Sequence, residues 1–235
     1  MELGKTKEDF LDGQVVLIDK PLEWSSFQVV NKVRWLLRKQ FGLKKLKVGH
    51  AGTLDPLATG LLILCVGKFT KRIETFQAQD KEYTGTILLG ATTPSYDAET
   101  EIDQTFPTDH IDKDLIENTL PKFIGTIQQQ PPVFSALKKE GKRLYEYARK
   151  GEEIEIPSRE IRIDAFEITR IELPEIDFRV VCGKGTYIRS LAHDFGKALN
   201  SGGYLTSLRR TKIGDFDVEN SKSIEEIEEY VKGFE

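Results

Sequence analysis

The sequence predicts an α+β protein built on a mixed, largely antiparallel sheet with flanking helices and loops. Strand-like and helix-like segments follow one another without the regular strand–helix–strand alternation that a parallel sheet needs. Residues 177–182 alternate apolar and polar side chains with a period of two, which indicates a half-buried strand paired with the strand predicted at 161–171. The 235 residues, of which 39% are hydrophobic, are enough for one large core.

The first half of the chain contains the clearest elements. Residues 14–18 predict a strand, and Ser25 or Ser26 can cap a helix that runs to about Gln40 and stops before Gly42. That helix is indicated by apolar residues at helical spacing: Phe27, Val30, Val33, Leu36 and Leu37. Three further segments follow: a buried strand at 61–66, a short helix at 71–76 and a strand at 83–89.

In the second half, residues 92–108 are acidic and polar and predict a long loop. The run Gln-Gln-Gln-Pro-Pro at 128–132 excludes a helix there. The remaining predicted elements are helices at 115–123, 187–199 and 224–231 and strands at 161–171, 177–182 and 205–213. No repeat or boundary divides the chain, so we expect a single domain over residues 1–235, with roughly the first ten residues disordered.

Composition limits the class of protein. The longest apolar run, Leu61–Val66, is far shorter than the ~20 residues that cross a bilayer, and the N-terminus carries no signal sequence. We therefore expect a cytoplasmic protein without membrane association. Cys65 and Cys182 lie in apolar strand-like runs and are expected to be buried free thiols. The three histidines lack metal-ligand spacing, so we expect no metal site.

The net charge of −4 conceals a strong segregation of charge. No acidic residue occurs between Trp24 and Leu54, while this stretch contains Lys32, Arg34, Arg38, Lys39, Lys44, Lys45 and Lys47. A second basic stretch contains Lys184, Arg189, Lys197, Arg209, Arg210 and Lys212 against only Asp194. Such segregation indicates a basic face for a phosphate backbone, although solvated helix faces are the alternative.

The segment from Gly49 to Gly60 is the most informative part of the sequence. It contains three glycines and one proline around a single carboxylate, Asp55, and it directly precedes the apolar strand at 61–66. Glycine and proline permit unusual backbone angles and close approach of a ligand. Asp-Pro is also an ordinary turn sequence, so the residues alone leave Asp55 as either a turn residue or a catalytic group.

Seven segments, taken in order, resemble the TruB group of the pseudouridine synthases. They are Val16–Pro21, Gly49–Gly60, Lys81–Tyr83, Pro132–Lys138, Gly141–Arg149, Gly183–Leu191 and Leu208–Thr211. The resemblance spans most of the chain and implies the pseudouridine synthase fold, with the active cleft across the sheet. Members of this group commonly carry a C-terminal PUA-type RNA-binding domain. Because the chain ends at Glu235, soon after the last segment, we expect no such domain here.

The resemblance also implies the roles of individual residues. Asp55 is expected to act as the nucleophile, Arg189 to pair with it, and Tyr83 to stack on the target base or move a proton. Lys20 is expected to support the loop or to contact a phosphate. Tyr187 and Leu208 are expected to line the uridine pocket, and His50 to lie beside the flipped nucleotide.

The implied function is isomerisation of the uridine in the TΨC loop of tRNA to pseudouridine, without a cofactor. We expect the chain to act as a monomer on the TΨC stem-loop and to need no protein partner. Two alternatives remain open: a noncatalytic RNA-binding or tRNA-folding module, and a pseudouridine synthase that acts on another RNA. A pure binder would not need both Asp55 and Arg189.

Overall fold

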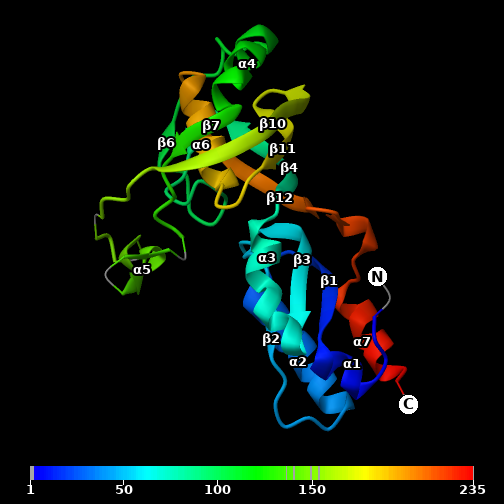
Figure 1. Ribbon diagram of the computed structural model, residues 1–235. Coiled ribbons are helices and arrows are strands. Elements are labelled where there is room, and N and C mark those ends of the chain that lie inside the picture. The colour runs from blue at the N-terminus through cyan, green and yellow to red at the C-terminus, as the bar shows by residue number, and fades with distance from the viewer. Residues whose placement is uncertain (1–2, 136, 140, 149, 153, 235) are drawn as a thin grey trace. The chain divides into compact units, whose positions relative to one another are not determined.

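The computed structural model describes residues 3–135, 137–139, 141–148, 150–152 and 154–234, which form two compact units. Unit 1 comprises Met1–Tyr83 and Arg209–Glu235, and unit 2 comprises Thr84–Leu208. Two strands, β4 (Lys81–Leu89) and β12 (Gly203–Ile213), run along the chain from one unit into the other (Figure 1). Helices and strands mix throughout, and the long strand pairs within each unit are antiparallel, so the predicted α+β class is confirmed.

Unit 1 contains two long strands that hold its functional loop. Strand β1 (Gln14–Lys20) pairs antiparallel with β3 (Ala58–Val66), from Gln14 opposite Val66 to Lys20 opposite Gly60. The remaining elements are α1 (Lys7–Asp12), α2 (Ser26–Gln40), β2 (Val48–His50), the 3-10 helix η1 (Gly67–Arg72), α3 (Ile73–Ala78), β13 (Phe216–Asp217), the 3-10 helix η3 (Val218–Asn220) and α7 (Ile224–Lys232). This pairing brings the end of β1 next to the residues that follow Asp55.

Helices α2 and α7 cover one face of these strands, and their apolar side chains explain the arrangement. Val29, Val33 and Leu37 of α2 are almost completely buried with Ile227 of α7 and Leu64 of β3. Ser25 caps α2 by accepting the Gln28 N–H, and the Gln28 side chain accepts the Ser25 N–H in return. The helix therefore begins where its cap predicts, and its first turn lies beside the Asp55 loop.

Unit 2 is built on a hairpin of two long strands, β10 (Arg159–Glu172) and β11 (Glu175–Cys182), with β7 (Gly125–Gln129) beside β10. Edge-to-face contacts among four phenylalanines, with ring centroids 5.2–6.3 Å apart, pack helix α6 (Ile188–Ala198) against this sheet. The other elements are β5 (Ala91–Thr92), β6 (Gln104–Thr105), α4 (Lys113–Thr119), the 3-10 helix η2 (Leu120–Phe123), β8 (Lys138–Lys139), β9 (Lys142–Arg143) and α5 (Leu144–Ala148).

The structure contradicts one prediction about a local segment, the disordered N-terminus, and agrees with others. The N-terminal segment that the sequence predicts to be disordered forms α1, which has a Thr6–Asp9 capping box and buries Phe10 against Phe41 and Phe234. Gln128 and Gln129 are the last two residues of strand β7, and their backbones pair with β10. Ala136 and Arg149, which lie in two of the motif segments, are outside the described residues, as are Met1 and Glu2. Cys65 and Cys182 are buried free thiols, as predicted.

Candidate active site

The Asp55 loop connects β2 to β3, and two glycines, one in the loop and one at the start of β3, adopt conformations that other residues rarely accept. Gly52 has a φ of +111° and Gly60 a φ of +100°. A Cβ atom on Gly60 would lie 2.3 Å from the carbonyl oxygen of Arg210, so a side chain at this position would clash with backbone. The Asp55 carbonyl accepts the N–H of Ala58 at 3.0 Å, so Asp55 does take part in a turn. This bond is made by the backbone and not by the carboxylate, which leaves the catalytic role open.

Arg210 holds the start and the end of this loop. Its side chain is only 1% exposed, and its guanidinium donates to three carbonyls. Nε bonds the Leu61 oxygen at 2.8 Å, and the terminal nitrogens bond those of Gly52 and Thr53 at 3.2 and 3.4 Å. The charge pattern of the sequence includes Arg210 in a basic stretch for a phosphate backbone. The structure corrects this, because a guanidinium that is buried against three carbonyls of its own chain is a support for the loop.

Lys20 holds the middle of the loop in a similar way. The residue is completely buried, and its ammonium donates to the carbonyls of Pro21, Trp24 and Pro56 at 2.8, 2.6 and 3.2 Å. Burial lowers the pKa of Lys20 to about 8, an effect that the nearby Asp55 opposes and that Arg210 reinforces. Of its two predicted roles, these contacts favour support of the loop over contact with a phosphate.

Ser26 fixes the residue directly before Asp55. Its hydroxyl accepts the Leu54 N–H at 2.8 Å and lies 3.0 Å from the Leu54 carbonyl oxygen, to which it donates. The Pro56 carbonyl, directly after Asp55, also accepts the Glu23 N–H at 2.8 Å. Both neighbours of Asp55 are therefore held through their backbone atoms. Sequence reasoning missed Ser26 because a serine beside a helix cap gives no signal of a distant partner.

His50 and Tyr83 also belong to unit 1. His50 ends β2 and is half-buried, and burial lowers the pKa of its imidazole, which favours the neutral ring at neutral pH. Pairing of β2 with β3 places His50 opposite Leu64. Tyr83 is a strand residue of β4 and is 8% exposed. The predicted roles of both residues toward a bound nucleotide stay predictions.

Arg189, in unit 2, is a buried cation in the first turn of α6. The residue is 4% exposed, and its two terminal nitrogens donate to the carbonyls of Ser95 and Phe134 at 3.0 and 2.8 Å. Its Nε lies 3.5 Å from a carboxylate oxygen of Asp97, which is itself buried. These contacts exclude the interpretation of Arg189 as a surface helix residue. The pairing with Asp55 that the sequence resemblance implies stays a prediction.

Tyr187 precedes Arg189 and has its backbone fixed from both sides. The side-chain amide of Gln129 accepts the Tyr187 N–H at 2.8 Å and donates to the Tyr187 carbonyl at 3.0 Å. The Arg159 guanidinium lies over the Tyr187 ring, 4.7 Å from its centroid, and also donates to the Gly185 carbonyl. Leu208 is a half-buried residue of β12, the last of unit 2. The roles of Tyr187 and Leu208 in a uridine pocket stay predictions.

Comparison with known families decides the class of the protein. Residues 38–188 match the model of the TruB family pseudouridylate synthase N-terminal domain, and residues 189–233 match that of the tRNA pseudouridylate synthase B C-terminal domain. The chain belongs to the TruB family of pseudouridine synthases. The boundary between the two matched regions falls between Ile188 and Arg189, within the first turn of α6.

Named TruB-family relatives are similar over nearly their whole length. A tRNA pseudouridine synthase B of Flavobacterium johnsoniae is 68% identical over 225 residues, which are 95% of this chain and 98% of the relative. One of Phocaeicola vulgatus is 56% identical over 95% of both chains. Among solved structures, a chain in a Cbf5–Nop10–Gar1 complex matches with a TM-score of 0.69 and 29% identity over 94% of this chain. The match covers 55% of that chain, so the present chain spans about half of its length.

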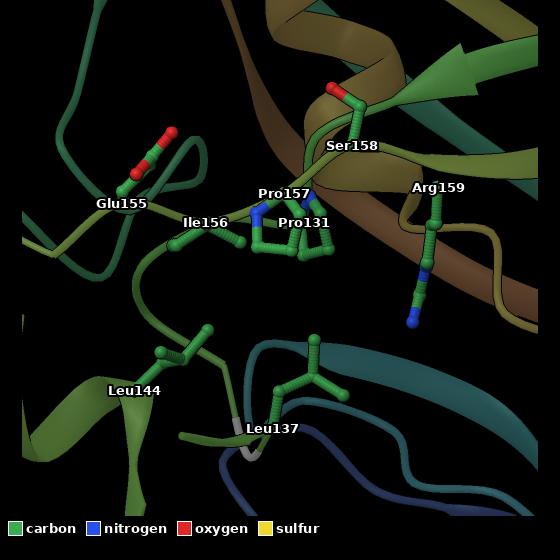
Figure 2. Close-up of a pocket in the computed structure, with 8 residues that line it drawn as sticks. All are labelled: Pro131, Leu137, Leu144, Glu155, Ile156, Pro157, Ser158 and Arg159. Atoms are coloured by element: carbon green, nitrogen blue, oxygen red, sulfur yellow. The ribbon is translucent and has the colours of Figure 1, made fainter. Parts of the chain in front are cut away.

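Unit 2 also contains a pocket of about 520 Å³ close to Tyr187, to which it is connected by Arg159 (Figure 2). In Figure 2, Leu137 and Leu144 lie across the pocket from Pro131, Ile156 and Pro157, with Arg159 at one side. The walls are therefore largely apolar, and the polar lining residues are Glu155, Ser158 and Arg159.

The basic residues of this TruB-family chain divide into buried and exposed groups. Lys44, Lys45 and Lys47 are exposed, whereas Arg189 and Arg210 are buried and use their charge inside the protein. Arg209 is also engaged, because it forms a two-point contact with the Asp19 carboxylate at 2.7 and 2.9 Å. Fewer basic residues are therefore available for an RNA backbone than the sequence predicts. Within the described part of the chain, no helix is long and apolar enough to cross a membrane.

Proposed function

We propose that the chain converts the uridine of the TΨC loop of tRNA to pseudouridine, with Asp55 as the nucleophile. The observation that carries the proposal is the construction of the Asp55 loop. Lys20, Ser26 and Arg210 hold the backbone on both sides of Asp55, so the carboxylate is positioned through the backbone of its neighbours. Preorganisation of this kind is what a catalytic carboxylate requires.

The reaction sets the tasks that these residues would perform. The N1–C1′ bond of the uridine breaks, the uracil turns while it stays bound, and a C5–C1′ bond forms. The proton on C5 is then lost and N1 gains one, so the product is an isomer of the substrate and no cofactor is consumed. Asp55 would attack C1′ or C6, or would promote elimination across C1′–C2′. Each path needs an anionic carboxylate.

The other residues have matching roles in this proposal. Arg189 would pair with Asp55 and favour its charged form. Tyr83 would stack on the uracil or transfer its proton, Tyr187 and Leu208 would line the pocket, and His50 would replace the stacking that the base loses when it leaves the RNA loop. Neutral His50 suits this last role, since burial already lowers its pKa.

The relatives support the choice of substrate. Several proteins that are 53–68% identical over at least 90% of this chain are named tRNA pseudouridine synthase B. We further propose that the chain works in the cytoplasm as a monomer without a protein partner. The exposed Lys44, Lys45 and Lys47 would then supply contacts to the RNA backbone.

Mapping pseudouridine in unmodified tRNA transcripts after incubation with this protein alone tests the proposal. We expect one pseudouridine, in the TΨC loop, in elongator tRNAs of different sequence, and none with Asp55→Asn. Pseudouridine at other positions only would favour a synthase for another RNA. Tight tRNA binding without any pseudouridine would favour the noncatalytic RNA-binding module.

The isolated TΨC stem-loop provides a second test of the substrate. We expect it to react with a turnover number close to that of whole tRNA, because the proposed contacts concern this arm alone. A stem-loop that stays unmodified while whole tRNA reacts would show that recognition extends to other parts of the tRNA.

A further inference from the structure

Two aromatic rings in unit 2, Tyr96 and His193, are stacked on one another. Their centroids are 3.9 Å apart and the planes are inclined by 17°, so the rings lie nearly parallel and in contact. Both residues are half-buried. Tyr96 has a φ of +64°, a left-handed backbone conformation that residues with a Cβ atom adopt at a cost in conformational energy. The surrounding structure must offset this cost.

The position of the pair relative to Arg189 makes this contact informative. Tyr96 lies between Ser95, whose carbonyl accepts a hydrogen bond from Arg189 at 3.0 Å, and Asp97, whose carboxylate lies 3.5 Å from Arg189 Nε. His193 follows Arg189 by four residues in α6 and therefore lies one turn along the same side of the helix. The ring pair is thus a second link between the two segments that meet at Arg189.

The turn that contains Tyr96 is held by its own hydrogen bonds, by β12 and by the Tyr96 ring. Thr93 and Ser95 donate their hydroxyls to the Asp97 carbonyl at 2.7 and 3.1 Å, and the Tyr96 N–H donates to the Thr93 carbonyl at 3.1 Å. The Leu205 N–H, in β12, donates to the Tyr96 carbonyl at 3.0 Å. These bonds close the turn and connect it to β12. The Tyr96 ring connects it to α6, the helix that carries Arg189.

Building on the proposed function, we infer that Tyr96 and His193 are positioning residues for the reaction. Their stacked rings hold the turn at 95–97 against α6, so that the Ser95 carbonyl and the Asp97 carboxylate set the orientation of the Arg189 guanidinium. Neither ring needs to touch the substrate. With the left-handed backbone at Tyr96, its side chain stacks on His193 while the Ser95 carbonyl and the Asp97 carboxylate lie beside Arg189.

The charge state of His193 agrees with this role. Burial lowers the pKa of its imidazole, and the nearby Lys197 lowers it further, while Asp103 opposes them. The ring is therefore neutral at neutral pH and can stack as an uncharged surface. The role requires a flat ring at each position and no proton transfer, which separates it from general acid–base chemistry.

Single-turnover rates on tRNA, measured for four variants, test the inference. Tyr96→Phe and His193→Phe keep a ring at each position, and we expect their rates to stay within about threefold of the parent. Tyr96→Ala and His193→Ala remove one ring, and we expect single-turnover rates at least about tenfold lower. The KM for tRNA, measured separately in steady state, should stay within about twofold of the parent. Equal rates for the alanine and phenylalanine variants would overturn the inference.

Tyr96→Gly separates positioning from stability. Glycine accepts the left-handed backbone without cost, so this variant should have a higher melting temperature than Tyr96→Ala. We nevertheless expect the two variants to be equally slow, since both lack the ring. If the rate instead recovers with the melting temperature, the pair has only a structural role.

An Arg189→Lys background tests whether the rings act through Arg189. If they do, Tyr96→Ala should lower the rate of Arg189→Lys by less than about twofold, because the group that it positions is already lost. Additive effects would contradict the inference. A normal rate for Arg189→Lys alone would instead show that the proposed role of Arg189 is wrong, so the two failures can be told apart.

Discussion

In unit 1 the residue proposed for the chemistry is a carboxylate on a loop, and buried cations hold the backbone around it. In unit 2 the proposed residue, Arg189, is itself the buried cation. Arg210 and Lys20 use their donors on carbonyls next to Asp55, whereas Arg189 uses its donors on Ser95 and Phe134 and lies beside Asp97. In unit 1 the proposed catalytic residue and the residues that hold its backbone are therefore different. In unit 2 Arg189 has both the proposed catalytic role and the buried structural contacts.

This difference has a consequence for substitutions. A change at Asp55 should affect activity and leave the fold intact, and a change at Arg210 should affect the fold first. A change at Arg189 should affect both, because its removal leaves the buried Asp97 carboxylate and two carbonyls without the donor that Arg189 supplies.

Asp55→Asn is expected to have the largest effect. The amide keeps the size of the side chain but removes its charge, so we expect at least about a thousandfold loss of turnover, or about 4 kcal/mol of barrier. The melting temperature and the affinity for tRNA should change little, because the loop is held through its backbone. A variant with activity within about tenfold of the parent would remove Asp55 from the chemistry.

Arg189→Lys should come second. An ammonium keeps the charge but cannot reach the Ser95 carbonyl, the Phe134 carbonyl and the Asp97 carboxylate together. We expect turnover to fall by about a hundredfold, or about 2.7 kcal/mol, together with a lower melting temperature. Steady-state kinetics and thermal unfolding measure the two effects. A loss of stability with normal turnover would show that Arg189 is a structural residue only.

Arg210→Lys should lower stability more than it lowers turnover. The shorter point charge cannot bond Gly52, Thr53 and Leu61 at once, and at least one buried carbonyl loses its donor. We expect roughly 2–4 kcal/mol lower stability in denaturant unfolding, and about a tenfold loss of turnover because the loop is less well fixed. If activity falls by more than in Arg189→Lys while stability is unchanged, Arg210 acts on the substrate and the comparison fails.

Charge reversal of Lys44, Lys45 and Lys47 should act on binding alone. If each lysine neutralises a phosphate, the slope of log K against log salt should flatten by roughly 2–3, with turnover at saturating tRNA unchanged. Reversal of three other exposed lysines, Lys5, Lys7 and Lys122, serves as a control for net charge. Equal effects of the two sets would show that the RNA does not lie along the segment at 44–47.

Asp194→Asn should have the smallest effect, confined to stability. Burial raises the pKa of Asp194 to about 6, against the opposing influence of Lys197. The folded state therefore binds more protons than the unfolded state between about pH 4 and 6, and the cost of the buried charge is fully present above about pH 6. Allowing for partial screening by solvent, we expect Asn to stabilise unit 2 by roughly 1–3 kcal/mol at about pH 7.5, with the gain vanishing near about pH 4.

Unfolding free energies across this pH range measure the effect, with exposed Asp215→Asn as the matched control. A gain for Asp194→Asn that does not depend on pH would show that its charge is not the cause.

The regular elements followed from the sequence where local signals were strong. Helix α2 begins after its Ser25 cap and ends at Gln40, as the apolar spacing and the following glycine predict. Strand β3 begins at Ala58, three residues before the predicted start at Leu61, and its pairing with β1 already includes Gly60, opposite Lys20. Helix α1 was missed because six residues are too few for a periodic pattern, and its stability depends on the distant Phe234.

The sequence by itself determined the fold class, the TruB family and the glycine-rich loop around Asp55, because these depend on residue type and local spacing. It could not tell the buried cations Lys20, Arg189 and Arg210 from the exposed Lys44, Lys45 and Lys47. A long basic side chain is buried only where several acceptors surround its charge. Those acceptors come from segments up to 158 residues away in the chain, so tertiary structure alone decides which charges support the site and which face the solvent.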